Sequence, residues 1–248
     1  MRLNKEIILQ RCKKNNDKYN FLDSVIPKEG MVLAGEMLLF SAICDLYKIE
    51  CIIESGLYHG VSTKMLADYF TNKKIISIDI DILPETRKLF EDYENVTLVE
   101  GDGTTEVPNA ILEAKEKGLN RLAVFIDGPK GKSQILLAKN ILQDVEFVAM
   151  HDLGKAFSAG MKDITNSNEH EELNKHFLGN YILSTESWYK DKFSFLNLEQ
   201  MRWLQNSSDH RWEDRNDGYD QNLWNPILQS ITPEGFGLAA VSKYGVDI

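Results

Sequence analysis

Five short apolar segments that alternate with longer segments of helical pattern constrain the fold of this chain more than any other feature. The apolar segments cover residues 51–55, 74–79, 96–100, 121–127 and 145–150, and the helical patterns cover residues 61–71, 84–93, 108–118 and 132–143. Strands that alternate with helices at this spacing are joined by right-handed crossovers and form a mainly parallel sheet. We therefore predict a doubly wound α/β fold with helices on both faces of the sheet.

Two more strands are expected later in the chain. Residues 166–178 read as a further helix, residues 181–185 as a sixth strand and residues 235–243 as a seventh. The prediction is thus a seven-stranded, mainly parallel sheet. A chain of 248 residues has the size of one globular α/β domain. We divide that single domain, 1–248, into a helical leader (1–48), a core (50–155) and an aromatic-rich excursion (186–230).

The first apolar segment ends in a glycine-rich turn that opens a helix. Gly56 and Gly60 bracket this turn, and Ser62 or Thr63 would cap the helix that follows. Backbone N–H groups at the start of a helix after such a turn face a ligand. The pattern therefore favours a nucleotide-type cofactor.

The spacing within the turn argues against a dinucleotide. The dinucleotide fingerprint is G-x-G-x-x-G, but here Tyr58 occupies the position of the second glycine and Val61 that of the third. A bulky residue there opposes the close approach of a pyrophosphate, which disfavours NAD and FAD. S-adenosylmethionine has no phosphate, and Glu54 at the strand end suits a ligand that carries an amino group.

Polar residues follow the carboxyl ends of the later segments, at the edge where open α/β sheets bind ligands. Asp79 ends the second segment about twenty residues beyond the glycine turn, where a carboxylate can accept hydrogen bonds from both hydroxyls of a ribose. Asp102 follows the third segment between two glycines, whose flexible backbone would bring it to the adenine amino group. Asp127 follows the fourth segment, and His151 and Asp152 follow the fifth.

These motifs together resemble the class I S-adenosylmethionine-dependent methyltransferases, which have a Rossmann-like fold. The resemblance is carried by Glu54-Ser55-Gly56 with Gly60, Ile78-Asp79-Ile80-Asp81, Gly101-Asp102-Gly103 and Ile126-Asp127-Gly128. It covers about residues 50 to 155 and is most similar to the cephalosporin-hydroxylase-like and rhamnosyl O-methyltransferase-like branch.

The resemblance implies a role for each of these residues. Glu54 and Gly56 would hold the methionine part of S-adenosylmethionine, Asp79 the ribose and Asp102 the adenine. The remaining residues expected at the cofactor are Tyr58, Gly60, Ser62 and Asp127. The superfamily also implies that the seventh strand is antiparallel.

Methyl transfer from a sulfonium requires an aligned acceptor and usually a group that removes its proton. Two sets of residues could promote the loss of that proton. Asp127, His151 and Asp152 could hold Mg²⁺ or another divalent ion that lowers the pKa of the acceptor hydroxyl, with His151 favouring a transition metal or no metal. Alternatively, Lys130 stands three residues after Asp127 and resembles the lysine base of catechol-type O-methyltransferases.

The composition excludes several classes of protein. The net charge of −10 and the isoelectric point near 5.1 disfavour a nucleic-acid surface, which needs clustered Lys and Arg. Cys12, Cys44 and Cys51 include no C-x-x-C pair, which fits a reducing cytoplasm and no structural zinc. The longest apolar stretch, residues 31–44, contains Glu36 and is shorter than a membrane span. The start of the sequence lacks the apolar core of a signal peptide.

The excursion contains all four tryptophans of the chain: Trp188, Trp203, Trp212 and Trp224. Aromatic surfaces among hydrogen-bonding groups suit a sugar or a planar acceptor. The same rings could instead fasten the excursion to the core or form a subunit contact. The leader, too, is of a type that either packs over the sheet or builds a homo-oligomer.

The sequence therefore predicts a cytoplasmic S-adenosylmethionine-dependent O-methyltransferase that acts on a small hydroxylated acceptor, a sugar or a secondary metabolite. An NAD-dependent oxidoreductase on a similar sheet is the first alternative. A non-catalytic binding protein that has kept the fold is the second, because a fold does not establish an activity.

Overall fold

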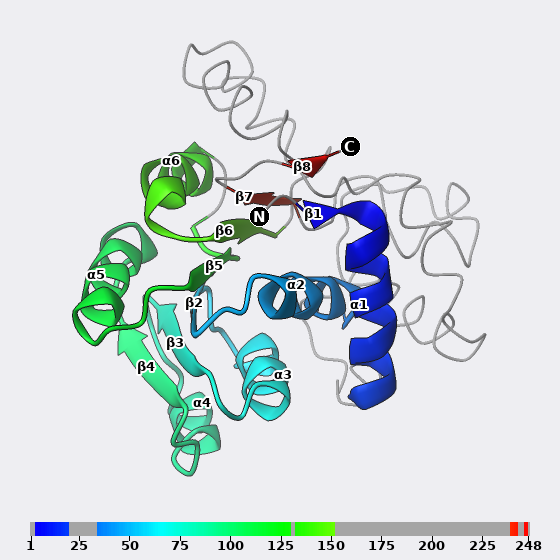
Figure 1. The fold of residues 1–248 in the computed structure, drawn as a ribbon. Coiled ribbons are helices and arrows are strands. Elements are labelled where there is room, and N and C mark those ends of the chain that lie inside the picture. Colours follow the sequence, from blue (N-terminus) through cyan, green and yellow to red (C-terminus); the bar gives the residue numbers. More distant parts are fainter. Residues whose placement is uncertain (1–2, 20–33, 130–131, 152–238, 243–245, 248) are drawn as a thin grey trace, which may run out of the picture.

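The computed structural model describes residues 3–19, 34–129, 132–151, 239–242 and 246–247. Within these residues the main sheet has six strands in the order β4-β3-β2-β5-β6-β7 (Figure 1). Their bounds are β2 Cys51–Ser55, β3 Lys74–Asp79, β4 Val96–Glu100, β5 Leu122–Ile126, β6 Phe147–Met150 and β7 Ala239–Ser242. The first five are parallel, and β7 pairs antiparallel with β6.

The order of the strands reverses between β2 and β5. The chain runs outward from β2 through β3 to β4, then returns to the other side of β2 to form β5 and β6. In open α/β sheets the crevice at such a reversal, outside the carboxyl ends of the strands, is where ligands bind. Ser55 of β2 lies opposite Ile126 of β5, so the carboxyl ends of these two strands coincide.

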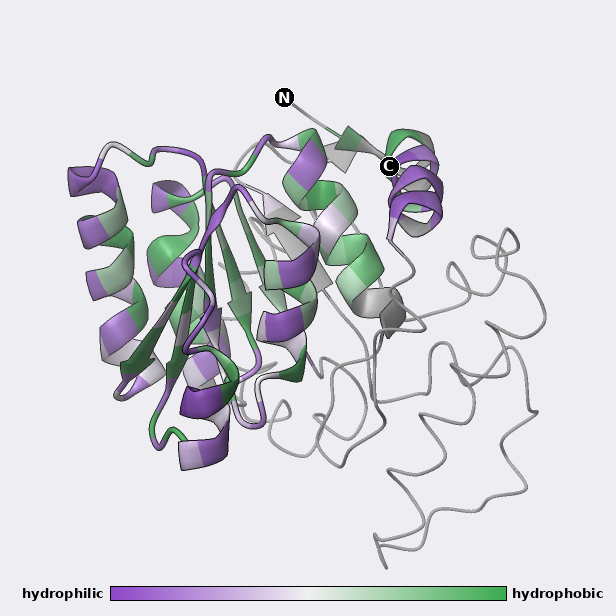
Figure 2. Ribbon diagram, turned by 90° about the horizontal axis from the view of Figure 1, so that it is seen from below, coloured by the Kyte–Doolittle hydropathy of each residue, from purple (hydrophilic) through white to green (hydrophobic). Residues whose placement is uncertain are grey.

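Helices cover both faces of the main sheet, as predicted. The helices are α1 Lys5–Lys18, α2 Ala34–Leu46, α3 Val61–Tyr69, α4 Pro84–Leu89, α5 Gly103–Glu116 and α6 Lys132–Ile141, and a 3₁₀ turn, η1 Leu142–Asp144, follows α6. Helices α1, α2 and α3 share one core cluster, whereas α5 and α6 share the other. Figure 2 shows the apolar strands between helices that carry hydrophilic residues on their outer sides.

The two cores follow from the alternation of side chains along each strand. Ile52 lies beside Ala123, and both are fully buried in the cluster beneath α2. The next residues along the strands, Ile53 and Val124, are fully buried in the cluster beneath α5. These strands are apolar throughout because both faces of a parallel sheet are covered.

The leader contributes helices α1 and α2 and a short strand, β1 Leu3–Asn4. This strand pairs in parallel with β8 Val246–Asp247 to form a separate two-stranded sheet. Fully buried leader residues, among them Phe40 and Tyr47, belong to the core beneath α2. Of the two predicted roles of the leader, the described residues therefore show packing over the sheet.

The predicted elements correspond to those of the structure, but several of their bounds differ; the helix predicted to end at residue 93, for example, ends at Leu89. Strands β2, β3 and β4 have the predicted bounds, and β7 is antiparallel as expected. The main sheet has six strands in the described part of the chain, and the predicted helix 166–178 and strand 181–185 lie outside it. The helix predicted to begin at Pro108 begins at Gly103, because Asp102 caps it there. The helix predicted to end at residue 143 ends at Ile141 and tightens into η1.

Among the residues that the structure describes, no helix has the length and apolar character needed to cross a membrane.

Candidate functional site

The glycine turn lies at the point where the strand order reverses. The carbonyl oxygen of Ser55 accepts hydrogen bonds from the backbone N–H groups of Asp127, at 2.7 Å, and Gly128, at 2.8 Å. Gly56 has φ of 104°, and a Cβ atom there would lie 2.7 Å from the nitrogen of Gly128. Only glycine therefore fits this turn, which follows β2 and packs against the residues that follow β5.

The carboxylate of Glu54 faces the protein rather than the crevice. Its side chain is fully buried and accepts hydrogen bonds from the hydroxyls of Ser62, Thr63 and Ser77, the last at 2.7 Å. Burial raises the pKa of Glu54, the three hydroxyls lower it and the charge of Asp127 raises it further. Glu54 thus fastens the start of α3 to β2 and β3, which differs from the expected contact with a ligand's amino group.

The expectation that Ser62 or Thr63 caps the helix was wrong. The N-cap residue of α3 is Gly60, with φ of 75° and no side-chain cap. The hydroxyls of Ser62 and Thr63 are taken by Glu54. A Cβ atom on Gly60 would lie 2.6 Å from the ring of Phe90, so close packing requires this second glycine.

Asp79 closes the turn from the end of β3. Its Oδ2 accepts a hydrogen bond from the backbone N–H of Tyr58 at 2.7 Å. Tyr58 has a positive φ of 45°, which is uncommon for a residue with a side chain, and its carbonyl oxygen accepts a bond from Thr86 Oγ1 at 3.0 Å. The side chain of Tyr58 is 49% exposed and packs against the ring of His59. The turn that Asp79 closes therefore carries an aromatic pair.

Asp102 caps helix α5 at the same edge of the sheet. Its Oδ1 accepts hydrogen bonds from the backbone N–H and from the hydroxyl of Thr104, both at 2.7 Å. The hydroxyl and then the N–H of Thr104 lower the pKa of Asp102. The next residue, Gly103, lies so close to β2 that a Cβ atom would be 2.1 Å from Ser55 Oγ. Gly103 thus has a structural role that the sequence analysis did not assign.

Asp127 and His151 meet at the ends of β5 and β6. Asp127 Oδ1 and His151 Nδ1 are 2.8 Å apart, and their side chains are 19% and 2% exposed. The structure thus brings two of the three predicted metal ligands together, in contact with each other. No group of three or more His, Cys, Asp and Glu side chains with metal-binding geometry occurs in the described part of the chain. Asp152 and Lys130 lie outside that part.

One residue at this edge was missed by the sequence analysis. Gln134, in α6, is fully buried, and its Nε2 donates to the carbonyl oxygens of Ile126, at 2.9 Å, and His151, at 3.1 Å. The signal was present, because Gln134 shares the buried stripe of α6 with Leu137, Ala138 and Ile141 at helical spacing. A polar residue on an apolar stripe indicates a buried polar contact.

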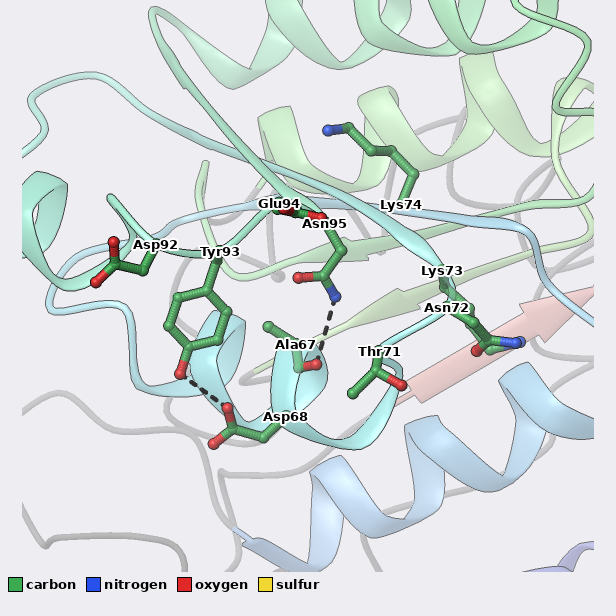
Figure 3. Close-up of a pocket in the computed structure, with 10 residues that line it drawn as sticks. All are labelled: Ala67, Asp68, Thr71, Asn72, Lys73, Lys74, Asp92, Tyr93, Glu94 and Asn95. Atoms are coloured by element: carbon green, nitrogen blue, oxygen red, sulfur yellow. Dashed lines mark hydrogen bonds between the residues drawn. The ribbon is translucent and has the colours of Figure 1, made fainter.

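The predicted acceptor site at residues 186–230, with its four tryptophans, lies outside the described residues. A hollow that the structure does describe lies elsewhere, at the amino ends of β3 and β4 (Figure 3). It is lined by Ala67, Asp68, Thr71, Asn72, Lys73, Lys74, Asp92, Tyr93, Glu94 and Asn95. It contains none of the predicted site residues.

No family model matches the sequence, and no curated protein matches it. Solved structures similar to the chain include an rRNA methylase from Streptococcus thermophilus, at 12% identity and a TM-score of 0.40, with 93% of this chain and 95% of that chain covered. A second is the SAH-bound methyltransferase PaMTH1 from Podospora anserina, at 16% identity and a TM-score of 0.37, with 58% and 61% covered.

A third similar structure is dTDP-glucose 4,6-dehydratase from Bacillus anthracis in complex with NAD, at 14% identity and a TM-score of 0.32, with 40% of this chain and 36% of that chain covered. The chain spans less than two thirds of the dehydratase and of PaMTH1. The similar structures thus include both methyltransferases and an NAD-bound enzyme. Likeness this distant does not choose between the two cofactors, so the choice depends on the residues of the site.

Proposed function

We propose that this protein is an S-adenosylmethionine-dependent O-methyltransferase of the class I type that acts on a small hydroxylated acceptor. One observation carries the proposal. At the reversal of strand order, the Gly56 turn packs on Asp127 and Gly128, while Asp79 borders the turn. This is the place where α/β sheets of this topology bind nucleotide-type ligands, and it presents carboxylates to that ligand.

The hydrogen bonds of the turn favour S-adenosylmethionine over NAD. A pyrophosphate needs backbone N–H groups that point at it. Here the N–H of Tyr58 donates to Asp79, and the N–H of Gly60 donates to the carbonyl of Leu57 at 2.7 Å. The carboxylates of Asp79 and Asp102 at this edge would also repel phosphate charge. A cofactor that carries a sulfonium and an ammonium group meets neither obstacle.

The residues present can hold such a cofactor. Asp79 would accept the ribose hydroxyls, Asp102 the adenine amino group, and the backbone at Gly56 would lie beside the methionine part. Bound there, S-adenosylmethionine supplies an electrophilic methyl group. Glu54 contributes indirectly, because its three hydroxyl partners fix the turn and the start of α3.

We assign the acceptor side of the reaction to Asp127 and His151. Transfer forms an oxygen–carbon bond as the sulfur–carbon bond breaks, and the acceptor hydroxyl loses its proton. Asp127, the more exposed of the two, would take that proton, while His151 holds its carboxylate at 2.8 Å. With Asp152 as a third ligand, the same pair would hold a divalent ion that acidifies the hydroxyl, and the imidazole suits a transition metal better than Mg²⁺.

Calorimetry tests the cofactor. We expect binding of S-adenosylmethionine and S-adenosylhomocysteine and no binding of NAD. Asp79→Ala should weaken this binding by about tenfold to a hundredfold, because ribose hydroxyls lose their acceptor. Asp81→Ala, which removes an exposed carboxylate two residues away, is the matched control and should bind as the parent does. Tight NAD binding, or an Asp79→Ala variant that binds like the control, would exclude the assignment.

A chelator distinguishes the two versions of the acceptor side. If Asp127, His151 and Asp152 hold a required ion, methyl transfer should stop in excess chelator and return with a divalent metal. Transfer that persists in chelator would exclude the ion and leave proton removal to Asp127 or Lys130. Asp127→Asn and Lys130→Met would then identify the base, because only the variant of the true base should lose kcat.

A further inference from the structure

Gln134 is the one fully buried amide side chain among the residues that the structure describes at the carboxyl edge of the sheet. It lies on the side of α6 that packs on the strands, between Ser133, which is exposed, and the buried Leu137 and Ala138. A helix that packs on a sheet needs only apolar residues along this stripe. An amide there therefore requires a specific reason.

The contacts of Gln134 supply that reason. Its Nε2 donates to the carbonyl of Ile126, the last residue of β5, and to the carbonyl of His151, the first residue after β6. The N–H of His151 donates to the same Ile126 carbonyl at 2.9 Å. Gln134 thus fastens both strand ends at the point from which Asp127 and His151 extend toward each other.

The orientation of the amide follows from its two backbone acceptors. Gln134 Oε1 is buried and has no hydrogen-bond partner among the described residues. The amide cannot be turned around, because its oxygen would then face two carbonyl oxygens. Among neutral side chains, only Asn and Gln have an NH₂ group whose two N–H donors can serve both carbonyls.

We propose that Gln134 is a positioning residue. By donating to backbone carbonyls at the ends of both β5 and β6, it fixes the positions of Asp127 and His151 relative to each other. Its effect on methyl transfer rests on the function proposed above, whereas its effect on the His151 ring does not. The two effects can therefore be measured separately.

The chain offers a matched control at the opposite edge of the sheet. Asn95 is also an amide that donates to two backbone carbonyls, that of Ala67 at 3.4 Å (Figure 3) and that of Phe70 at 3.1 Å. Gln134→Met and Asn95→Leu each keep the approximate shape of the side chain and remove both donors. Each should lower the melting temperature by a few degrees, but only the first should disturb the pair.

The primary measurement is the nuclear magnetic resonance spectrum of the histidine rings at one fixed pH. The chain has five histidines, and His151→Gln identifies the signal of His151. We expect Gln134→Met to shift the ring nitrogens of His151 and leave the other four histidines in place. Asn95→Leu should leave His151 unchanged. Gln134→Glu, whose carboxylate would face both carbonyls, should shift His151 further than the Met variant does.

Kinetics supply the second measurement. Gln134→Met should lower kcat by about tenfold to a hundredfold, since small displacements of reacting groups have effects of this size. Its affinity for S-adenosylmethionine should stay within about twofold of the parent. If the parent does not bind this cofactor, the proposed function fails, while the ring shift still decides the role of Gln134. An unshifted His151 in folded Gln134→Met, an equal shift in Asn95→Leu, or a Gln134→Met protein that does not fold would each overturn the proposal.

Discussion

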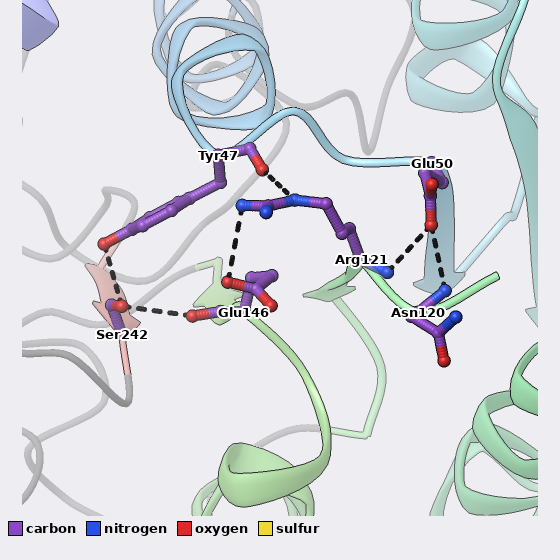
Figure 4. Close-up of polar contacts among 6 residues, drawn as sticks. All are labelled: Tyr47, Glu50, Asn120, Arg121, Glu146 and Ser242. Carbon is purple, nitrogen blue, oxygen red and sulfur yellow. Dashed lines mark hydrogen bonds and ion pairs between the residues drawn. The ribbon is translucent and has the colours of Figure 1, made fainter. Parts of the chain in front are cut away.

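The two edges of the main sheet are both polar, yet their polar groups are used differently. At the amino edge, side chains bond to one another and to backbone carbonyls in a continuous network that links α2, β5, β6 and β7 (Figure 4). At the carboxyl edge, Asp79 and Asp102 bond to backbone N–H groups of turns and remain partly or fully exposed. Polarity alone thus does not distinguish a structural edge from a binding edge.

The amino-edge network begins at Tyr47, at the end of α2. Its hydroxyl donates to Ser242 Oγ in β7 at 2.8 Å, and Ser242 Oγ donates to the carbonyl of Glu146 at 3.1 Å. Arg121 Nε donates to the carbonyl of Tyr47 at 2.6 Å, and the Arg121 guanidinium lies 3.7 Å from the Glu146 carboxylate. These contacts fasten β7 and the end of α2 to the residues just before β5 and β6.

The carboxylate of Glu50, at the amino edge, differs from those of Asp79 and Asp102 because it connects two neighbouring strands. Glu50 accepts hydrogen bonds from the backbone N–H groups of Arg121 and Asn120, and these bonds lower its pKa. It therefore ties the start of β2 to the start of β5. The carboxyl edge combines exposed carboxylates with glycines that no other residue can replace, at the reversal of strand order. That combination supports the proposal that the ligand binds at the carboxyl edge.

The largest effect is expected from Gly56→Ala, which disrupts the packing of the glycine turn at the carboxyl edge. The positive φ and the clash with Gly128 should together lower the free energy of unfolding by about 3 kcal/mol or more. Cofactor binding should be lost with it. Gly118→Ala is the control, because Gly118 has φ of 82° but open space around its Cβ position, so only about 1 kcal/mol of backbone strain is expected. Chemical denaturation and calorimetry measure both quantities, and equal effects at the two glycines would contradict the close packing at Gly56.

The second prediction concerns the amino edge. Arg121→Met removes the bond to the Tyr47 carbonyl and the ion pair with Glu146, and should lower the free energy of unfolding by about 1 to 2 kcal/mol, a range reduced for the partial exposure of Arg121. Lys117→Met, which removes an exposed ion pair with Glu113 at the end of α5, should leave the free energy of unfolding close to that of the parent. Both variants should bind cofactor as the parent does. Weakened binding in a folded Arg121→Met would show that the two edges are coupled.

Much of the fold could be predicted because its signals are local. A buried parallel strand is apolar along its whole length, and the segments that became β2, β3 and β4 have little other interpretation. The position of Asp79 and Asp102 at one edge follows from the parallel direction of the strands. The start of α5 was placed too late because Pro108 marks a helix start more visibly than the Asp102 cap does.

The parts of the site that were not predicted depend on contacts between distant segments. The sequence places Glu54 at a strand end beside a glycine turn, but not the hydroxyl of Ser77, 23 residues later, that draws its carboxylate inward. The contact of Gly103 with Ser55 and the contact of Gln134 with His151 also join residues far apart in the chain. Residue type indicates that a group is polar or small, whereas only the fold shows which partner it meets.

The third prediction concerns pH. Because burial raises the pKa of Glu54 above its ordinary value of 4.5, the folded protein keeps a proton there that the unfolded chain has lost. Its contribution to stability is complete below pH 4.5 and is lost as pH rises through the raised pKa. Glu54→Gln should remove this decline, since an amide can still bond to the three hydroxyls. Urea denaturation of both proteins across this range measures it, and parallel pH profiles would contradict the buried, proton-binding role.

The smallest change in stability is expected from Asp102→Asn, which separates the two roles assigned to this exposed carboxylate of the carboxyl edge. Asn and Asp are comparable N-cap residues, so the melting temperature should stay close to that of the parent, whereas Asp102→Ala should lower it. In the parent, Oδ1 alone accepts both bonds from Thr104. If the oxygen of the introduced amide keeps that cap, its NH₂ group takes the place of Oδ2.

An NH₂ group in that place cannot accept a hydrogen bond from the adenine amino group, so two donors would face each other. We therefore expect Asp102→Asn to lose about tenfold in affinity for S-adenosylmethionine while keeping its stability. Calorimetry and thermal denaturation of the same protein sample give both values. If the Asn variant matches the parent in both, Asp102 is a helix cap and nothing more, and the adenine would have to be recognised by another residue of this edge.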